Sequence, residues 1–207
     1  MAETMGVNPQ TDAAKSSLFA QSLEEHLRVV GLLESHLPLF QEMAEAIIAS
    51  LRRGGTVFWC GNGGSAADSQ HMAAELVGRF RRERRALRAV ALTTDTSILT
   101  ALANDYGYET VFARQLESLG KEGDVLIGLS TSGNSENVCR AIVKARELGI
   151  HTMVMTGASG GKMKTLAHTC FNAPSSETAR IQECHSLAAH MICDYVEHTL
   201  HAEEQRK

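Results

Sequence analysis

The pattern of apolar residues changes near residues 54 and 55, from a helical spacing to short apolar runs that alternate with helical segments. From Leu18 to Leu51 apolar residues recur at every third or fourth position, with an interruption around Pro38. This spacing predicts two amphipathic helices, because one face of a helix returns about every 3.6 residues. The preceding residues 1–15 are polar and rich in turn formers, so we expect them to be frayed and the domain to span residues 16–203.

Beyond residue 55, short apolar runs followed by Gly, Ser or Thr alternate with helical patterns. The runs are TVFWCGNGGS, AVALTTDTS, DVLIGLSTSGNS, TMVMTGASGG and TCFNAPSS, and the helical patterns cover residues 66–80, 98–102 with 108–119, 136–148 and 162–167. Such alternation predicts crossover units and a parallel sheet. A long amphipathic helix is expected from about Arg180 to His201. The predicted fold class is α/β, with the ligand site beyond the carboxyl ends of the strands.

Composition narrows the class of protein. The chain has 207 residues, of which 43% are hydrophobic and 21% charged, and its net charge is −4. These values are typical of one globular domain and do not favour nucleic acid or a membrane as a partner. We see neither a signal peptide nor an apolar stretch long enough to span a bilayer, so a cytoplasmic protein is expected. Its five cysteines form no CxxC pattern, which predicts reduced thiols and no cysteine zinc site.

An arginine-rich stretch, FRRERRALR, joins the first predicted crossover helix to the next strand. We expect residues 79–88 to form a solvated connector, with Glu83 relieving the positive charge, because the chain as a whole is negative.

Two loops rich in Gly and Ser each lead from a predicted strand into a predicted helix. The first is GNGGS, residues 61–65, in which Ser65 is expected to cap the helix and offer its hydroxyl. The second is STSGNS, residues 130–135, which carries four hydroxyls and no basic residue. Helix amino ends attract anions, so the pair predicts a site for a phosphate monoester. Either loop alone also fits an ordinary turn, and neither matches a dinucleotide or nucleoside triphosphate motif.

His71 and Glu75 lie four residues apart in QHMAAEL. On a helix this spacing puts an imidazole and a carboxylate on one face, where both can meet one ion or one substrate. An isolated pair of this kind is more often a surface pair. The position of this pair, on the helix that begins at GNGGS, favours a functional role.

Four segments resemble the bacterial phosphoheptose isomerases, a branch of the sugar isomerase (SIS) domain proteins. They are CGNGGSAADSQHMAAELVGRF, LTTDTSILTALANDYGYE, GDVLIGLSTSGNSENV and RIQECHSLAAHMICDYVE, and the resemblance runs from about residue 17 to 200. It implies one SIS domain with a five-stranded parallel sheet flanked by helices, and a homotetramer with active sites at subunit contacts. The implied reaction converts sedoheptulose 7-phosphate into D-glycero-D-manno-heptose 7-phosphate, the first step toward ADP-heptose and the lipopolysaccharide core.

The resemblance also assigns individual residues. One zinc ion per subunit would be held by four ligands, His71, Glu75, Gln182 and His190. On helix geometry alone His185, three residues after Gln182, is the nearer partner, whereas the family pattern points to His190. Substrate contacts, with Ser65 and Glu75 added from the loop and helix patterns, fall on Asn62, Gly63, Gly64, Ser65, Glu75, Asn104, Asp105, Ser130, Thr131, Ser132, Ser135 and Gln182.

An aldose–ketose interconversion needs one proton removed from carbon 1 and one delivered to carbon 2, through an enediol or enediolate. We expect Glu75 to be the base, His190 to be the second acid/base, and zinc to act as a Lewis acid. Two alternatives stay open: a non-catalytic SIS protein that binds the bacterial replication initiator, and an isomerase or sensor for another phosphosugar. Inactivity on sedoheptulose 7-phosphate would favour the first, and a panel of ketose phosphates would distinguish the second.

Overall fold

The computed structural model describes residues 9–206, with side chains described from Ser17 onward. Its centre is one parallel sheet in the order β2-β1-β3-β4-β5, in which every neighbouring pair is parallel. The strands are β1 (Val57–Gly61), β2 (Ala89–Ala91), β3 (Val125–Ser130), β4 (His151–Thr156) and β5 (Thr169–Asn172). The predicted α/β class and the five parallel strands are confirmed.

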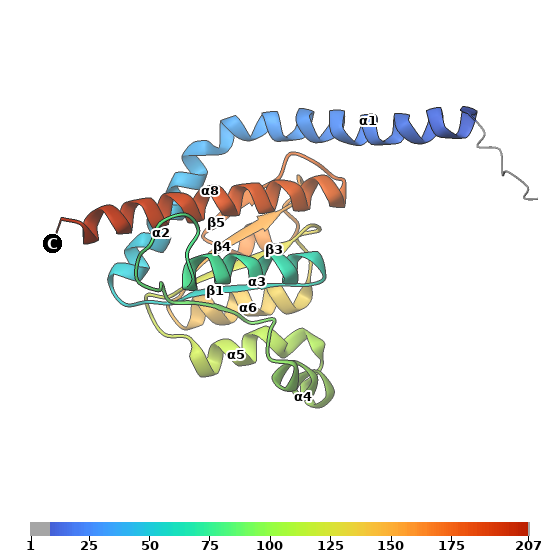
Figure 1. Ribbon diagram of the computed structural model, residues 1–207. Coiled ribbons are helices and arrows are strands. Elements are labelled where there is room, and N and C mark those ends of the chain that lie inside the picture. Colours follow the sequence, from blue (N-terminus) through green and yellow to red (C-terminus); the bar gives the residue numbers. More distant parts are fainter. Residues whose placement is uncertain (1–8, 207) are drawn as a thin grey trace, which may run out of the picture.

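Helices cover both faces of the sheet (Figure 1). One face carries α2 (Leu37–Arg52), α3 (Gly64–Val77) and α8 (Thr178–Glu204), with α1 (Pro9–Gly31) and the 3₁₀ helix η1 (Leu32–His36) beside them. The other face carries α4 (Thr96–Tyr106), the 3₁₀ helix η2 (Tyr108–Thr110), α5 (Val111–Leu119), α6 (Glu136–Glu147) and α7 (Met163–Leu166).

Alternation along the strands divides the core between the two faces. In β1, Val57 and Trp59 pack toward α2, α3 and α8, whereas Phe58 and Cys60 pack toward α5 and α6. Trp59 is completely buried, as expected for a strand aromatic. Each fully buried large apolar side chain stabilises the fold by about 1.5–3 kcal/mol, so the sheet positions the loops at its ends rigidly.

Helix α1 starts earlier than the pattern predicts. The residues from Pro9 to Lys15 belong to the helix, and the part of the frayed-terminus prediction that concerns residues 1–8 lies outside the described residues. In Figure 1, α1 projects beyond the body of the domain above α8. Its exposed apolar side chains are those of Leu18 (65%), Phe19 (79%), Leu23 (59%) and Leu27 (61%).

Four of the six arginines in residues 79–88 are exposed, as expected for a solvated connector, whereas Arg82 and Arg84 are not. Arg81 and Arg82 both pair with Asp194 (3.0 and 2.8 Å), Arg85 pairs with Glu204 (2.8 Å), and the Arg84 side chain is completely buried. Glu83 pairs with Arg79 alone, at 3.7 Å. The charges are balanced by carboxylates on α8, more than 100 residues away in the sequence, which the arginine run by itself does not reveal.

In the part of the chain that the structure describes, no helix combines the length and the apolar character needed to cross a bilayer. All five cysteines lie in the described part, and each is a free thiol.

Candidate active site

The two Gly/Ser loops meet where the order of the strands reverses. Strand β2 lies beyond β1 and strand β4 lies beyond β3, so the connections leaving β1 and β3 run to opposite sides. Sheets of this order bind ligands in the crevice at that point. The loops are joined by a reciprocal side-chain pair, in which the amide of Asn62 donates to Asn137 (2.9 Å) and that of Asn137 donates to Asn62 (2.8 Å). Asn137 is buried in the first turn of α6, and the sequence analysis missed it.

The first loop turns into α3 through a glycine. Gly63, with φ of +57°, is the amino-terminal cap of α3, a backbone conformation that other residues rarely adopt. The prediction that Ser65 caps the helix is wrong: Ser65 lies inside the first turn and is buried, and its carbonyl accepts the Ser69 hydroxyl (2.8 Å). The chain needs φ above zero earlier than Ser65, and glycine supplies it.

The second loop gathers hydroxyl groups around the end of β3. The Oγ of Ser130 lies 2.8 Å from the Oγ of Ser135 and 3.3 Å from that of Ser132. Gly133, with φ of +65°, packs so tightly that a Cβ there would lie 2.2 Å from the carbonyl oxygen of Gly160. The carbonyl of Thr131 accepts the amide of Gly157 (3.0 Å), so the loop is held from both sides.

The amino ends of α3 and α6 both face this crevice, as each follows directly from one of the loops. Aligned peptide dipoles place partial positive charge at both ends. Together with the hydroxyls, they make the crevice suitable for an anion of the size of a phosphate group.

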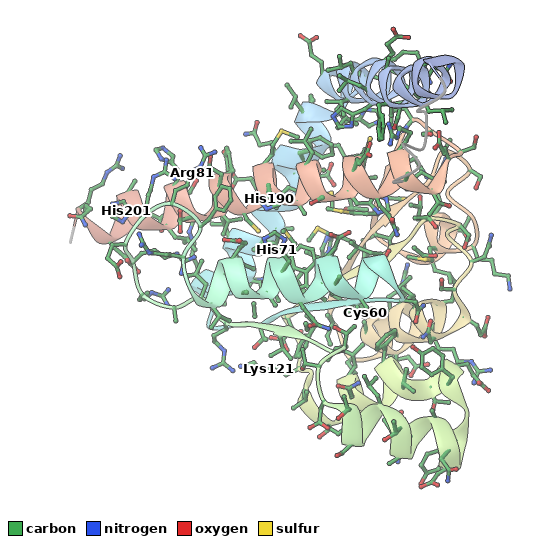
Figure 2. The ribbon with its side chains drawn as sticks, turned by 45° about the vertical axis from the view of Figure 1, so that its right-hand side comes forward. Cys60, His71, Arg81, Lys121, His190 and His201 are labelled. Atoms are coloured by element: carbon green, nitrogen blue, oxygen red, sulfur yellow. The ribbon has the colours of Figure 1, made fainter. Side chains whose placement is uncertain are left out.

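A cluster of imidazole and carboxylate groups lies between α3 and α8. The Nε2 of His71 is 3.0 Å from an Oε of Glu75, so the predicted one-face geometry of this pair is observed. The His190 ring lies against that of His71, with centroids 4.9 Å apart and an interplanar angle of 73°. Candidate ligand atoms from His71, Glu75 and His190 all lie within 4.8 Å of one another. Figure 2 shows His190 on α8 facing His71 on α3.

Two contacts orient the His190 ring. Its Nδ1 is 2.8 Å from the carbonyl oxygen of Ser186, to which it donates, and this leaves Nε2 as the available nitrogen. Phe80, just beyond α3, lies 5.5 Å from the same ring, centroid to centroid. The ring is therefore held by its own helix on one side and by the connector on the other.

His185 does not join the cluster. It is completely buried, and its Nε2 is 3.0 Å from the carbonyl oxygen of Thr156, to which it donates. Five residues turn a helix through about 140° beyond a full turn, so His185 and His190 point to different sides of α8. Burial lowers the pKa of His185 to about 4, against the opposing effect of its hydrogen bond to Thr156. The geometric alternative that favoured His185 over His190 is therefore not supported.

Gln182 lies against the first of the two Gly/Ser loops and not beside the histidines. A Cβ at Gly64 would lie 2.5 Å from its amide nitrogen, so the side chain covers the first turn of α3. That turn is about 10 Å along the helix axis from His71. A contact between Gln182 and a phosphosugar fits this position more directly than ligation of an ion beside His71.

Asn104 and Asp105 lie on α4, which packs on the face of the sheet opposite to α3 and α8. They are in the last turn of α4 and are exposed, with the Asn104 amide donating to Asp105 (2.8 Å). Three residues after Asp105, the hydroxyl of Tyr108 donates to Asn62 (3.2 Å). Within one chain the structure does not bring Asn104 and Asp105 to the cluster.

Asp68 is a further residue that the sequence analysis missed. It is half-buried and lies on α3, where Asp68, His71 and Glu75 follow the three- and four-residue spacing of one helix face. Burial raises its pKa, and the nearby His71 and His190 act in the opposite direction. The same spacing that singled out His71 and Glu75 extends to Asp68.

Comparisons with known proteins agree with this arrangement. The family model described as SIS domain matches residues 19–157. The chain is 56% identical to a phosphoheptose isomerase of Roseiflexus sp., over 83% of this chain and 87% of that protein. It is 54% identical to a phosphoheptose isomerase of Aquifex aeolicus, over 87% of this chain and 93% of that protein.

Solved structures show the same likeness. Phosphoheptose isomerase from Neisseria gonorrhoeae superposes with a TM-score of 0.83 at 43% identity, covering 87% of this chain and 97% of that one. A phosphoheptose isomerase from Francisella tularensis gives a TM-score of 0.82 at 35% identity, covering 91% and 98%. The fold and the resemblance predicted from the motifs are confirmed.

The buried His185 predicts a pH-dependent stability. Its pKa of about 4 lies below the ordinary value of 6.5, so the unfolded chain binds a proton more readily than the folded one between these pH values. Stability is then lost as the pH falls through this range. The wild-type protein should lose about 2 kcal/mol relative to His185→Gln between pH 6.5 and pH 5, measured by urea unfolding. The exposed His198→Gln variant is the control, and a wild-type advantage over His185→Gln that does not change with pH would contradict the assignment.

Proposed function

The chain belongs to the phosphoheptose isomerases of the SIS domain family, and we propose that it converts sedoheptulose 7-phosphate into D-glycero-D-manno-heptose 7-phosphate. The observation that carries this proposal is the cluster of His71, Glu75 and His190, in which His71 and Glu75 lie on α3, the helix that begins at the GNGGS loop. The product is the first intermediate of the route to ADP-heptose and the lipopolysaccharide core. We place the reaction in the cytoplasm, in keeping with the free thiols of all five cysteines.

The distance between the loops and the cluster fits a long sugar. Gly64 and His71 are separated by about 10 Å along α3. Sedoheptulose 7-phosphate carries its phosphate and its carbonyl at opposite ends of the carbon chain. With the phosphate held by Ser130, Ser132 and the amino ends of α3 and α6, carbons 1 and 2 reach toward Glu75 and His190.

In the proposed mechanism Glu75 takes the proton from carbon 1 of the open-chain ketose. The electron pair moves to form the carbon 1–carbon 2 double bond of an enediolate, and the carbon 2 oxygen gains a proton. Return of a proton from Glu75 to carbon 2 then restores a carbonyl at carbon 1, so that no external oxidant is needed. His190 transfers the proton between the two oxygens, because its Nδ1 is engaged with Ser186 and its Nε2 is free to exchange.

The donor set suits one zinc ion per subunit. Two imidazoles and a carboxylate from His71, His190 and Glu75 are ligand types that zinc takes, and their atoms already lie within 4.8 Å. Bound there, the ion would supply Lewis acidity to the substrate oxygens. Gln182 is the predicted fourth ligand, and would have to turn from Gly64 toward the cluster to serve as one.

Glu75 cannot be a tight ligand and a strong base at once, since coordination lowers its basicity. We propose that it alternates between the two roles. The Nε2 of His71 lies 3.0 Å from an Oε of Glu75, so the carboxylate already stands beside a second group of the cluster on the same helix face.

We propose a homotetramer whose subunits complete one another's active sites. Support comes from the exposed apolar stripe of α1 and from the 49% exposure of the His71 side chain, which a second chain would cover. Asn104 and Asp105 would then contact the substrate of an adjacent subunit, which accounts for their distance from the cluster within one chain.

Catalysis should depend on the cluster residues. Glu75→Gln and His190→Gln should each lower kcat on sedoheptulose 7-phosphate by about 10²–10⁴-fold, because each removes a proton-transfer group. Product formation by NMR measures this, with five- and six-carbon ketose phosphates run alongside. The exposed His198→Gln on the same helix is the matched control. Full activity in Glu75→Gln would rule out its role as base, and inactivity of the wild type alongside capture of the replication initiator would favour the non-catalytic alternative.

Zinc binding should require residues from both helices. The metal-free protein should take up one zinc per chain, and His71→Gln and His190→Gln should weaken binding by more than about tenfold, since each removes a ligand. Competition with a chromophoric chelator measures the affinity. Equal affinity in His71→Gln, His198→Gln and wild type would place the ion elsewhere.

Assembly should depend on the exposed stripe of α1. A Phe19→Glu/Leu23→Glu double variant should have a lower mass than the wild-type tetramer in light scattering, because two charges cannot be buried there without partners. Leu119→Glu, at a site of similar exposure (53%) on α5, is the control. A wild-type monomer, or a double variant of unchanged mass, would contradict the proposed assembly.

A further inference from the structure

A buried carboxylate organises the connector that follows α3. Glu197 on α8 is completely buried, and its oxygens accept the backbone amides of Phe80 (2.8 Å), Arg81 (2.8 Å) and Arg82 (2.9 Å). Three consecutive amides converging on one carboxylate fix the path of the chain as it leaves α3.

Arg84 joins the same carboxylate to the carboxyl end of α3. Its guanidinium, also completely buried, lies 3.3 Å from Glu197 and donates to the backbone carbonyls of Glu75, Leu76 and Gly78, each at 2.9 Å. These carbonyls are among those a helix end leaves without partners, and a cation satisfies them well. Arg84 thus holds the backbone of Glu75 itself.

Three side-chain contacts show how α8 lies along α3 and the residues that follow it. Gln182 lies against Gly64, His190 lies against His71, and Glu197 lies against the residues just beyond α3. The contacts follow the same order on both helices, so α3 and α8 run in the same direction. Glu197 is seven residues after His190, which is about two turns and therefore nearly the same face.

We propose that Arg84 and Glu197 form a buried clamp that sets the position of α3 along α8 and so holds His71 and Glu75 opposite His190. This inference rests on the proposed function in that the cluster it positions is the proposed reaction centre. Neither residue touches the reacting atoms; both are positioning residues. The clamp also brings Phe80 against the His190 ring, since the amide of Phe80 is one of those that Glu197 accepts.

The negative charge of Glu197 and the positive charge of Arg84 compensate each other inside the protein. Burial by itself would raise the pKa of Glu197, but the three backbone amides and the Arg84 charge together outweigh burial and hold that pKa below its usual value. Removing either partner would leave the other buried and uncompensated, which is far more costly than losing an exposed pair.

The first test compares Glu197→Gln with Glu204→Gln. The second variant removes a partly exposed carboxylate on the same helix, which pairs with Arg85 of the connector, so it is a matched control. Glu197→Gln should lower both zinc affinity and kcat by about tenfold or more, as is usual when partners that orient ligands are lost. Inhibition by inorganic phosphate should be unchanged, because the loops lie at the other end of α3. Glu204→Gln should match the wild type in all three.

The outcomes separate the clamp from the proposed function. Weaker zinc binding in Glu197→Gln together with a wild type inactive on sedoheptulose 7-phosphate would support the clamp and reject the reaction. An active wild type with a Glu197→Gln variant of normal zinc affinity and kcat would overturn the clamp, even if the variant melts at a lower temperature. If Glu197→Gln does not fold, Arg84→Lys, which keeps the charge but not the forked donors, is judged by the same criteria.

A second test needs no variant. If the clamp positions the cluster, zinc must in turn stabilise the clamp, because coupling between two sites is reciprocal. Zinc should slow hydrogen exchange of the Phe80, Arg81 and Arg82 amides by about tenfold more than that of Gly107 and Gly120, which cap α4 and α5. Equal protection of the two sets would overturn the proposal.

Discussion

The packing of α3 against α8 is the contact on which the rest of the site depends. Helix α3 begins at the GNGGS loop, carries His71 at its middle and Glu75 in its last turn, and ends under Arg84. Helix α8 provides Gln182, His190 and Glu197 in the same order and direction. Because both helices are also anchored on the sheet through buried residues such as Met72, Leu76 and Ala188, neither can slide without disturbing the core. Anion binding and proton transfer are thereby held at a fixed separation along one pair of helices.

Charge is distributed so that each end of the site has a different character. The end at the two Gly/Ser loops, where we propose that the phosphate binds, offers hydroxyls, amides and helix amino ends, none of which carries a formal charge. The other end holds the titratable side chains of the cluster, His71, Glu75 and His190. Most arginines of the connector are paired with carboxylates of α8, so their positive charge stabilises the protein's own structure and is not directed at the substrate.

The parts of this arrangement that the sequence could predict are those set by local spacing. The strand and helix alternation predicted the parallel sheet, and the four-residue spacing predicted that His71 and Glu75 share a face, because both follow from the geometry of a single element. The order of the strands, and therefore the meeting of the two loops, depends on the direction that each crossover connection takes. No single segment of the sequence determines that direction. Asn137 was missed for this reason: its partner, Asn62, is 75 residues away.

Whether His185 or His190 faces the cluster depends on how α8 is rotated about its axis against the sheet. Polar and apolar residues are mixed along α8, so the sequence does not determine this rotation. The partners of the arginine run were missed for a related reason. A run of like charges does not reveal its partners, and here they lie on a helix that is distant in sequence and adjacent in space. Ser65 was misjudged locally, since the backbone needed a positive φ two residues earlier.

The most direct measurement is a crystal structure of the protein grown with zinc and sedoheptulose 7-phosphate, with data collected at the zinc absorption edge. The account predicts one anomalous peak per chain between His71, Glu75 and His190, and a phosphate group between the loops at residues 61–65 and 130–135. An ion bound away from α3 and α8, or a phosphate held outside both loops, would contradict it.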